Sequence, residues 1–157
     1  MTATSLTTAT VAKALQPGGD ISAAYDAVWQ KLWAQPYVPA AVLELCRLRL
    51  AQLHQVDAEL ASRQSAAADE GLTEDKIQSL LSGAHLRDPR FSAAELAALE
   101  FTEMYAQDPG AISDEQADAV KAALGEPGLV CLVESLGFIE GRIRLALMFS
   151  ALTRQTH

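Results

Sequence analysis

Four side chains that could carry chemistry lie close together in the stretch ELCRLRLAQLHQVDAELASR, which begins at Glu44. His54 titrates near neutral pH when unperturbed, so His54 or Glu44 could move a proton. Glu59 and Arg63 stand at i and i+4 with the acid on the N-terminal side, and together they could hold a carboxylate-bearing substrate. The alternative is a helix salt bridge worth ~0.2–0.5 kcal/mol beside a solvated turn histidine.

Glu44 is the most informative of the four, because the helix around it is otherwise apolar. Burying an isolated charge is costly, so this carboxylate must be paired or partly exposed. Arg47 at i+3 and the distant Arg142 are its candidate partners. Glu44, His54 and Glu59 include no regular i, i+4 ligand pair of the kind that helical zinc sites use, so we predict neither a metal nor another cofactor.

The two cysteines, Cys46 and Cys131, form neither a Cys-x-x-Cys motif nor a metal-ligand spacing. Both stand among apolar residues and are expected to be small buried hydrophobes. Cys46 is two positions from Glu44, so the two side chains should point to different sides of a helix. The expected compartment is the cytoplasm, where thiols stay reduced.

The composition limits the classes of partner. A chain of 157 residues fits one domain, and 50% hydrophobic residues can form a substantial core. The net charge of −8 argues against nucleic-acid and anionic membrane partners.

The N-terminus lacks the pattern of a signal peptide, and no uncharged apolar run reaches the ~20 residues that span a bilayer. The closest candidate, residues 129–152, is interrupted by Glu134, Glu140, Arg142 and Arg144.

Helical spacing and capping residues position these side chains. Residues 1–20 are expected to form a flexible arm, and Gly71 and Gly125 are expected to end helices. Thr73, Ser92-x-x-Glu95 and Ser113-x-x-Gln116 are predicted helix starts, the last two as capping boxes, and Pro127 should open the last helix. The predicted helices cover about 22–34, 39–53 with a continuation or restart toward 69, 73–81, 92–108, 113–125 and 127 onward. Seven or eight helices and no strand define an all-α protein.

Two segments predict a homo-oligomer. The helix with Trp29 and Trp33 and the apolar last helix together exceed what one small bundle readily buries. Large apolar faces usually mark interfaces. The alternative is that both segments simply fill the core.

Several segments also carry a resemblance to a known family. ELCRLRLAQL is followed by a polar turn, by EGLTEDKIQSLLSG, by DPRFSAAELAALEFTEMYAQDPGAISDEQADAVKAAL and by LVESLGFIEGRIRLAL. In order and spacing, these segments resemble the carboxymuconolactone decarboxylase and alkylhydroperoxidase D family, with Arg142 at the place of an arginine in its closing helix. The resemblance implies an alkylhydroperoxidase D-like helical bundle over residues 21–157 that assembles into trimers or hexamers.

The chain departs from that family at its active-site motif, which is Glu, eleven residues, Cys-x-x-Cys, three residues, His. Counting from Glu44, the cysteine positions fall on Val56 and Glu59 and the histidine position on Arg63. Neither Val56 nor Glu59 can form a sulfenic acid, and Arg63 stays protonated, so the thiol peroxidase mechanism is not available. The decarboxylase branch relies on the same histidine, so its chemistry does not transfer directly.

Three functions follow, in order of preference. The first is a divergent family member that binds or transforms a small organic acid or lactone, with Glu44 and His54 as candidate catalytic residues. Glu59 and Arg63 would then bind the substrate. The second is a non-catalytic oligomeric scaffold or interaction protein. The third is an alkylhydroperoxidase that uses a cysteine outside the motif.

Overall fold

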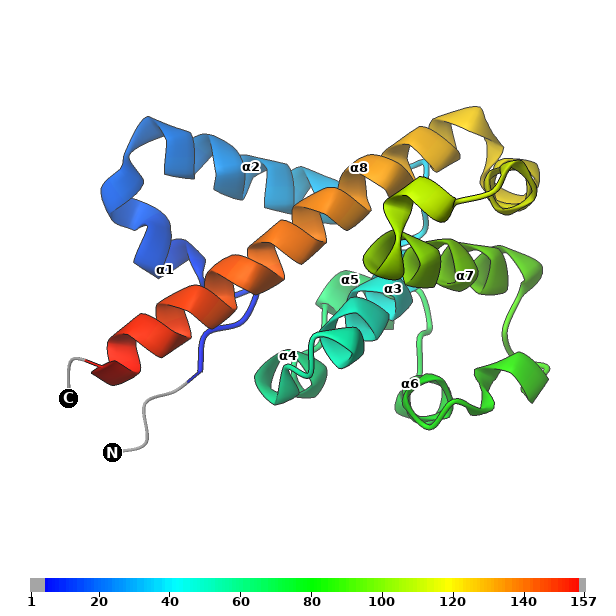
Figure 1. The fold of residues 1–157 in the computed structure, drawn as a ribbon, viewed down its shortest axis with the longest axis horizontal. Coiled ribbons are helices and arrows are strands. Elements are labelled where there is room, and N and C mark those ends of the chain that lie inside the picture. Colours follow the sequence, from blue (N-terminus) through cyan, green and yellow to red (C-terminus); the bar gives the residue numbers. More distant parts are fainter. Residues whose placement is uncertain (1–4, 156–157) are drawn as a thin grey trace.

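The computed structural model describes residues 5–155, and this part of the chain contains helices and no strand. The predicted all-α bundle is therefore confirmed (Figure 1). Three short 3-10 turns lie between the α-helices. The α-helices are α1 (Ala12–Leu15), α2 (Asp20–Ala34), α3 (Ala40–Leu53), α4 (Asp57–Ala61), α5 (Ser65–Asp69), α6 (Glu74–Leu81), α7 (Ala93–Gln107) and α8 (Asp114–Gln155).

The helix starts predicted at Thr73, Ser92 and Ser113 are confirmed. Each depends on hydrogen bonds between near neighbours, which the sequence specifies. The Thr73 hydroxyl accepts from the third amide of α6, and Ser92 and Glu95 form a complete capping box at α7. A similar reciprocal pair of bonds joins Ser113 and Gln116. Helix α8 is interrupted at Gly125, whose φ of 76° is left-handed, so it consists of two helices that meet at a kink.

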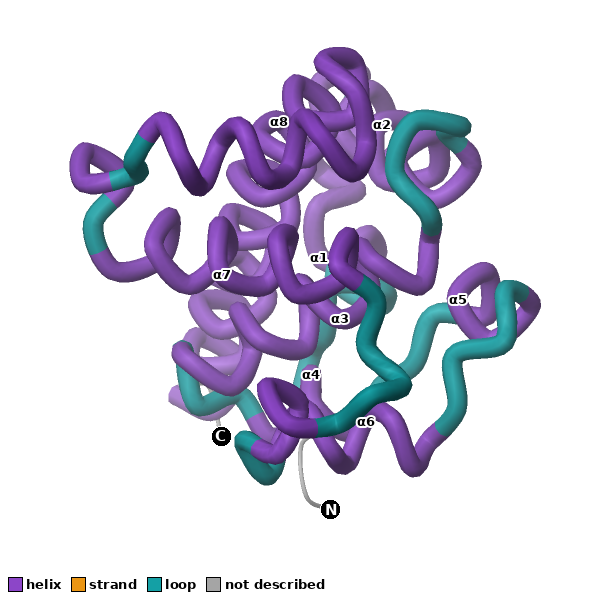
Figure 2. Tube along the Cα trace, turned by 90° about the vertical axis from the view of Figure 1, so that its right-hand side faces the viewer, coloured by secondary structure: helices purple, strands orange, loops and turns teal. Residues whose placement is uncertain are grey.

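Helix α3 lies at the centre of the bundle, which explains its sequence (Figure 2). It contacts α2, α4, α5, α6, α7 and α8. Leu43 and Leu50 belong to a core shared with α2, α7 and α8, while Leu45 and Leu48 face a second core shared with α6 and α7. A helix that is buried on all sides is apolar all round. The charged groups that α3 does bury must therefore find partners inside the protein.

The N-terminal segment is packed, contrary to the expectation of a flexible arm. Among the described residues of that segment, Thr8 and Val11 are completely buried. The Leu6 amide donates to Ser150 Oγ at 2.8 Å, which fastens the segment to the end of α8. The first four residues lie outside the described part. The segment docks because it supplies hydrogen bonds to buried charges, a long-range need that its own composition does not reveal.

The tryptophans and α8 differ in burial. Trp29 is buried and meets Trp33 edge to face at 5.4 Å between ring centroids, so α2 uses these rings to fill the core.

Helix α8 keeps exposed apolar side chains, including Val130, Val133 and Met148. It contains a window that is long and apolar enough to cross a bilayer by length and composition, and only 28% of that window is buried. Core helices of soluble proteins meet the same two criteria.

Candidate functional site

A buried ion network lies at the centre of the predicted site. Arg47 donates from Nε and Nη2 to the two carboxylate oxygens of Glu44, at 2.7 and 2.6 Å, and from Nη1 to Glu59 at 2.6 Å. All three side chains are at most 1% exposed. Burial alone lowers the pKa of Arg47, but the hydrogen bonds and charges of both carboxylates outweigh it and raise that pKa. Of the two candidate partners of Glu44, Arg47 is therefore the one that binds it.

A second buried arginine joins this network to the N-terminal segment. Glu59 accepts hydrogen bonds from the amide and the hydroxyl of Thr8, and the Thr8 carbonyl in turn accepts from Arg142 Nε. Arg142 also donates to Asp26 at 3.1 Å, and its guanidinium lies 4.5 Å from the centroid of the Trp29 ring. Burial lowers the pKa of Arg142, which Asp26 partly opposes. Arg142 thus serves the N-terminal segment rather than Glu44.

The predicted pairing of Glu59 with Arg63 is wrong. Helix α4 ends at Ala61, so the two side chains do not stand on one helix face. Glu59 turns inward to Arg47, whereas Arg63 is 31% exposed and pairs with Glu74 at 2.8 Å. Hydrogen bonds from Arg63, and next from Gln78, hold the pKa of Glu74 at about 2. These two residues therefore cannot hold a substrate together.

Glu44 and Arg63 do share a cavity. A small space of about 120 Å³ lies between the N-terminal half of α3, the α4–α5 connection, α5 and the start of α6. Glu44 and Arg63 contribute its charged groups together with Glu74, while Leu72 and Ile77 provide apolar wall. The carboxylate of Glu44 also accepts from the Gln64 amide at 3.2 Å, so the cavity wall is held to the ion network. A small polar molecule can meet one buried acid and one accessible cation there.

His54 does not line the cavity beside Glu44. It is the C-cap of α3, and its Nε2 lies 2.8 Å from Glu140 Oε1 on α8. It stands ten positions after Glu44, which is about 15 Å along the helix axis. Direct proton exchange between these two candidate catalytic residues is therefore excluded by geometry. Glu140, which no sequence pattern marks as a site residue, instead connects His54 with Arg144.

Glu140 predicts a pH-dependent contribution to stability. Burial raises its pKa, but hydrogen bonds from Tyr105, His54 and Arg144 outweigh that effect and hold the pKa below the ordinary value of 4.5. A carboxyl with a lowered folded-state pKa stabilises the fold above its unfolded-state pKa, and this contribution is lost as the pH falls through the folded-state pKa.

We therefore expect Glu140→Gln to lower the free energy of unfolding near pH 7 and to differ less from the wild type as the pH falls toward about 3. Urea unfolding at several pH values measures this difference. Asp118→Asn, an exposed substitution in the part of α8 before the kink, is the control. A Glu140→Gln effect that stays constant with pH would contradict the assignment.

The two thiols have different surroundings. Cys46 is fully buried, as predicted, and burial raises its pKa to about 12 despite a hydrogen bond with Thr102. Cys131 is only half-buried, which corrects the expectation of a buried hydrophobe, and burial raises its pKa too. Its Sγ lies 3.9 Å from Ser135 Oγ. Neither thiol is therefore activated, since an activated thiol has a lowered pKa.

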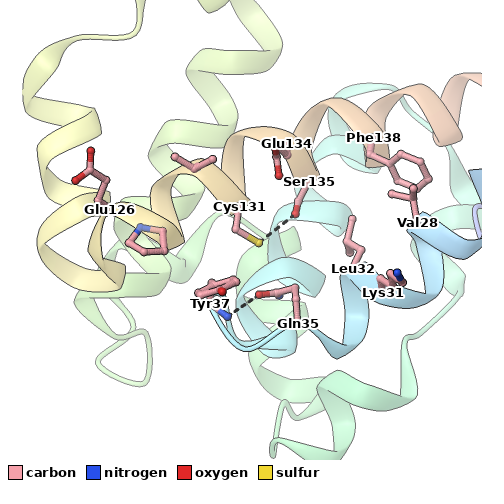
Figure 3. A pocket seen from close by; sticks show the side chains of 12 residues that line it. Val28, Lys31, Leu32, Gln35, Tyr37, Glu126, Cys131, Glu134, Ser135 and Phe138 are labelled. Carbon is pink, nitrogen blue, oxygen red and sulfur yellow. Dashed lines mark hydrogen bonds between the residues drawn. The ribbon is translucent and has the colours of Figure 1, made fainter.

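Cys131 faces a larger groove, which is not predictable from the sequence. The groove encloses about 710 Å³ between α2 and the second half of α8 (Figure 3). Its walls are mostly apolar side chains, among them Val28, Val130 and Phe138. The sequence of α8 does show more apolar side chains than a small bundle buries. The groove itself arises only because α2 packs against that helix.

What the site can do follows from its groups. It holds paired charges, a small polar cavity and unactivated thiols, so it suits binding better than nucleophilic catalysis. Within residues 5–155, no three His, Cys, Asp or Glu side chains are grouped so that they could hold a metal ion. Neither a protein-family model nor a curated protein matches the chain.

Proposed function

We propose that the protein is a divergent relative of the carboxymuconolactone decarboxylase and alkylhydroperoxidase D family that binds a small organic acid or lactone and has no thiol peroxidase activity. It would act as a cytoplasmic homo-oligomer, a trimer or hexamer as in that family. The observation that carries the proposal is the buried triad of Glu44, Arg47 and Glu59. An ion pair occupies the place where the family motif requires a thiol.

The triad supports the loss of redox chemistry. Glu59 is fully buried and bound by Arg47, and Val56 is also buried, so neither motif position presents a reactive group. A substitute thiolate would have to come from Cys46 or Cys131, and the pKa of each is raised. Peroxide reduction requires the thiolate.

The ligand class follows from the cavity beside Glu44. Arg63 is its accessible cation, and its present partner Glu74 is 58% exposed. An exposed pair of this kind contributes little to stability, so a ligand carboxylate can replace Glu74 at low cost. Planar guanidinium groups bind carboxylates in a bidentate manner. A volume of about 120 Å³ restricts the ligand to a small molecule.

A non-catalytic scaffold is the second candidate. The observation in its favour is the exposed apolar surface of α8, including Val130 and Val133. Extended apolar surface marks interaction sites in soluble proteins. In this case, assembly itself would be the function, and the cavity beside Glu44 would stay without a ligand.

Peroxide turnover tests the redox part of the proposal. With a thiol reductant and an organic hydroperoxide, the purified protein is expected to turn over no faster than the background without protein. Cys46→Ser and Cys131→Ser should match the wild type, because neither thiol is activated. Wild-type turnover that one of these substitutions abolishes would establish the third function instead.

Thermal melts test the ligand. Among a panel of small carboxylates and lactones, at least one is expected to raise the melting temperature, since a ligand at about 100-fold its Kd adds about 2.7 kcal/mol. Arg63→Gln should remove the shift, whereas the exposed control Arg87→Gln should retain it. No shift with any compound, or a shift unaffected by Arg63→Gln, would reject the organic-acid site and favour the scaffold.

A further inference from the structure

The groove between α2 and α8 has an apolar and exposed rim. Val28 on α2 is 46% exposed and Tyr37, just after α2, is 54% exposed. On the opposite wall Val130 of α8 is 52% exposed. Three exposed, largely apolar side chains therefore surround an opening of about 710 Å³. In a soluble protein such a surface usually belongs to an interface.

The charges on this rim are divided between its two walls. Lys31 lies on the α2 wall, and Glu126 and Glu134 lie on the α8 wall (Figure 3). Lys31 and Glu134 are exposed, and within the described residues neither forms an ion pair. Glu126 lies 3.8 Å from Lys121 Nζ, so Glu134 is the acid with no cation of its own chain beside it. One wall thus offers a cation and the other an acid.

This division is self-complementary under two-fold symmetry. An isologous interface brings the same patch of two subunits together, so that residue i meets j and j meets i. A two-fold axis that runs along the groove places α2 of one copy against α8 of the other. Lys31 of each copy then faces Glu134 of the other, and the exposed apolar side chains of both rims become buried together. A small-molecule ligand would use the apolar floor but would leave the rim exposed.

We propose that the α2–α8 groove is the two-fold interface between two copies of this chain. This inference rests on the hexameric form of the homo-oligomer proposed above, because a trimer has no two-fold axis, and it specifies which face joins two copies. In the interface, the apolar rims supply the driving force, and the two Lys31–Glu134 contacts fix the register. The half-buried Cys131 becomes enclosed when the second copy binds.

The decisive experiment is a charge exchange between chains, followed by sedimentation velocity. Lys31→Glu alone places acid against acid at both contacts, and Glu134→Lys alone places cation against cation. Each variant is expected to associate about tenfold or more weakly than the wild type. An equimolar mixture of the two variants should recover association, because the mixed pair restores both opposite-charge contacts. An effect confined to one chain cannot be repaired by mixing.

A second pair of variants tests the apolar rim. Val130→Asp is expected to weaken association about tenfold or more, because the interface would bury an unpaired carboxylate. Leu86→Asp is the matched control: Leu86 is 75% exposed and does not line the groove, so association should be unchanged. Circular dichroism checks that both variants keep their helix content.

The outcomes separate this inference from the proposal on which it rests. An assembled wild type whose mass is unaffected by all three groove variants, or a variant mixture that fails to recover, overturns the groove interface and leaves the homo-oligomer standing. A wild type that sediments as a monomer at every concentration overturns both. Binding of the monomer to phosphatidylcholine vesicles, lost in Val130→Asp, would assign the groove to a lipid surface instead and would also overturn the inference.

Discussion

Replacing Arg47 by alanine is expected to lower the free energy of unfolding by about 3–5 kcal/mol. The guanidinium is fully buried and pairs with Glu44 and Glu59, both of which are at most 1% exposed. Its removal leaves two buried carboxylates without their cation. Chemical denaturation at neutral pH measures the loss. This is a large fraction of the ~5–15 kcal/mol that stabilises a typical domain.

Arg49 provides the matched control on the same helix. It is 22% exposed and pairs with Glu103, which is 30% exposed, so Arg49→Ala should cost about 1 kcal/mol or less. Equal losses for the two arginines would contradict the proposed role of the buried triad. Where Arg47→Ala fails to fold, the triple change Glu44→Gln, Arg47→Met and Glu59→Gln is informative. It removes all three charges at similar volume and should recover most of the stability.

Arg142→Ala is expected to cost about 3 kcal/mol and to release the N-terminal segment. Arg142 is fully buried, donates to the Thr8 carbonyl and to Asp26, and stacks over Trp29. Its loss removes the hydrogen bonds and the ring contact at once. Hydrogen exchange should show lost protection of the Thr8 amide, which in the wild type donates to Glu59.

Arg144→Ala is the control for this prediction. Arg144 stands two positions further along α8, is 67% exposed and makes one long contact of 3.4 Å with Glu140. Its removal should cost about 0.5 kcal/mol and leave the Thr8 amide protected. If Arg142→Ala destabilises the protein without changing Thr8 exchange, the arginine does not hold the N-terminal segment.

In residues 44–63, some contacts of the candidate site residues were predictable from the sequence and others were not. The pairing of Glu44 with Arg47 was available from its i+3 spacing, and the burial of Cys46 from its apolar neighbours. The partner of Glu59 was not available, because the short helix α4 ends before Arg63 and turns Glu59 toward α3. The turn at His54 was available as one of two alternatives, but its half-burial and its bond to Glu140 were not, because that bond joins residues that are 86 positions apart.

By itself the sequence determined the all-α class, the helix starts at Thr73, Ser92 and Ser113, and the absence of a thiol pair. These features depend on interactions between near neighbours or on residue identity alone, so no knowledge of packing was required. Tertiary structure alone decided the docking of the N-terminal segment, the position of Arg63 on the cavity beside Glu44, and the groove along α8. Each of these depends on how separate helices approach one another, because a buried charge takes whichever partner the packing brings within hydrogen-bond distance.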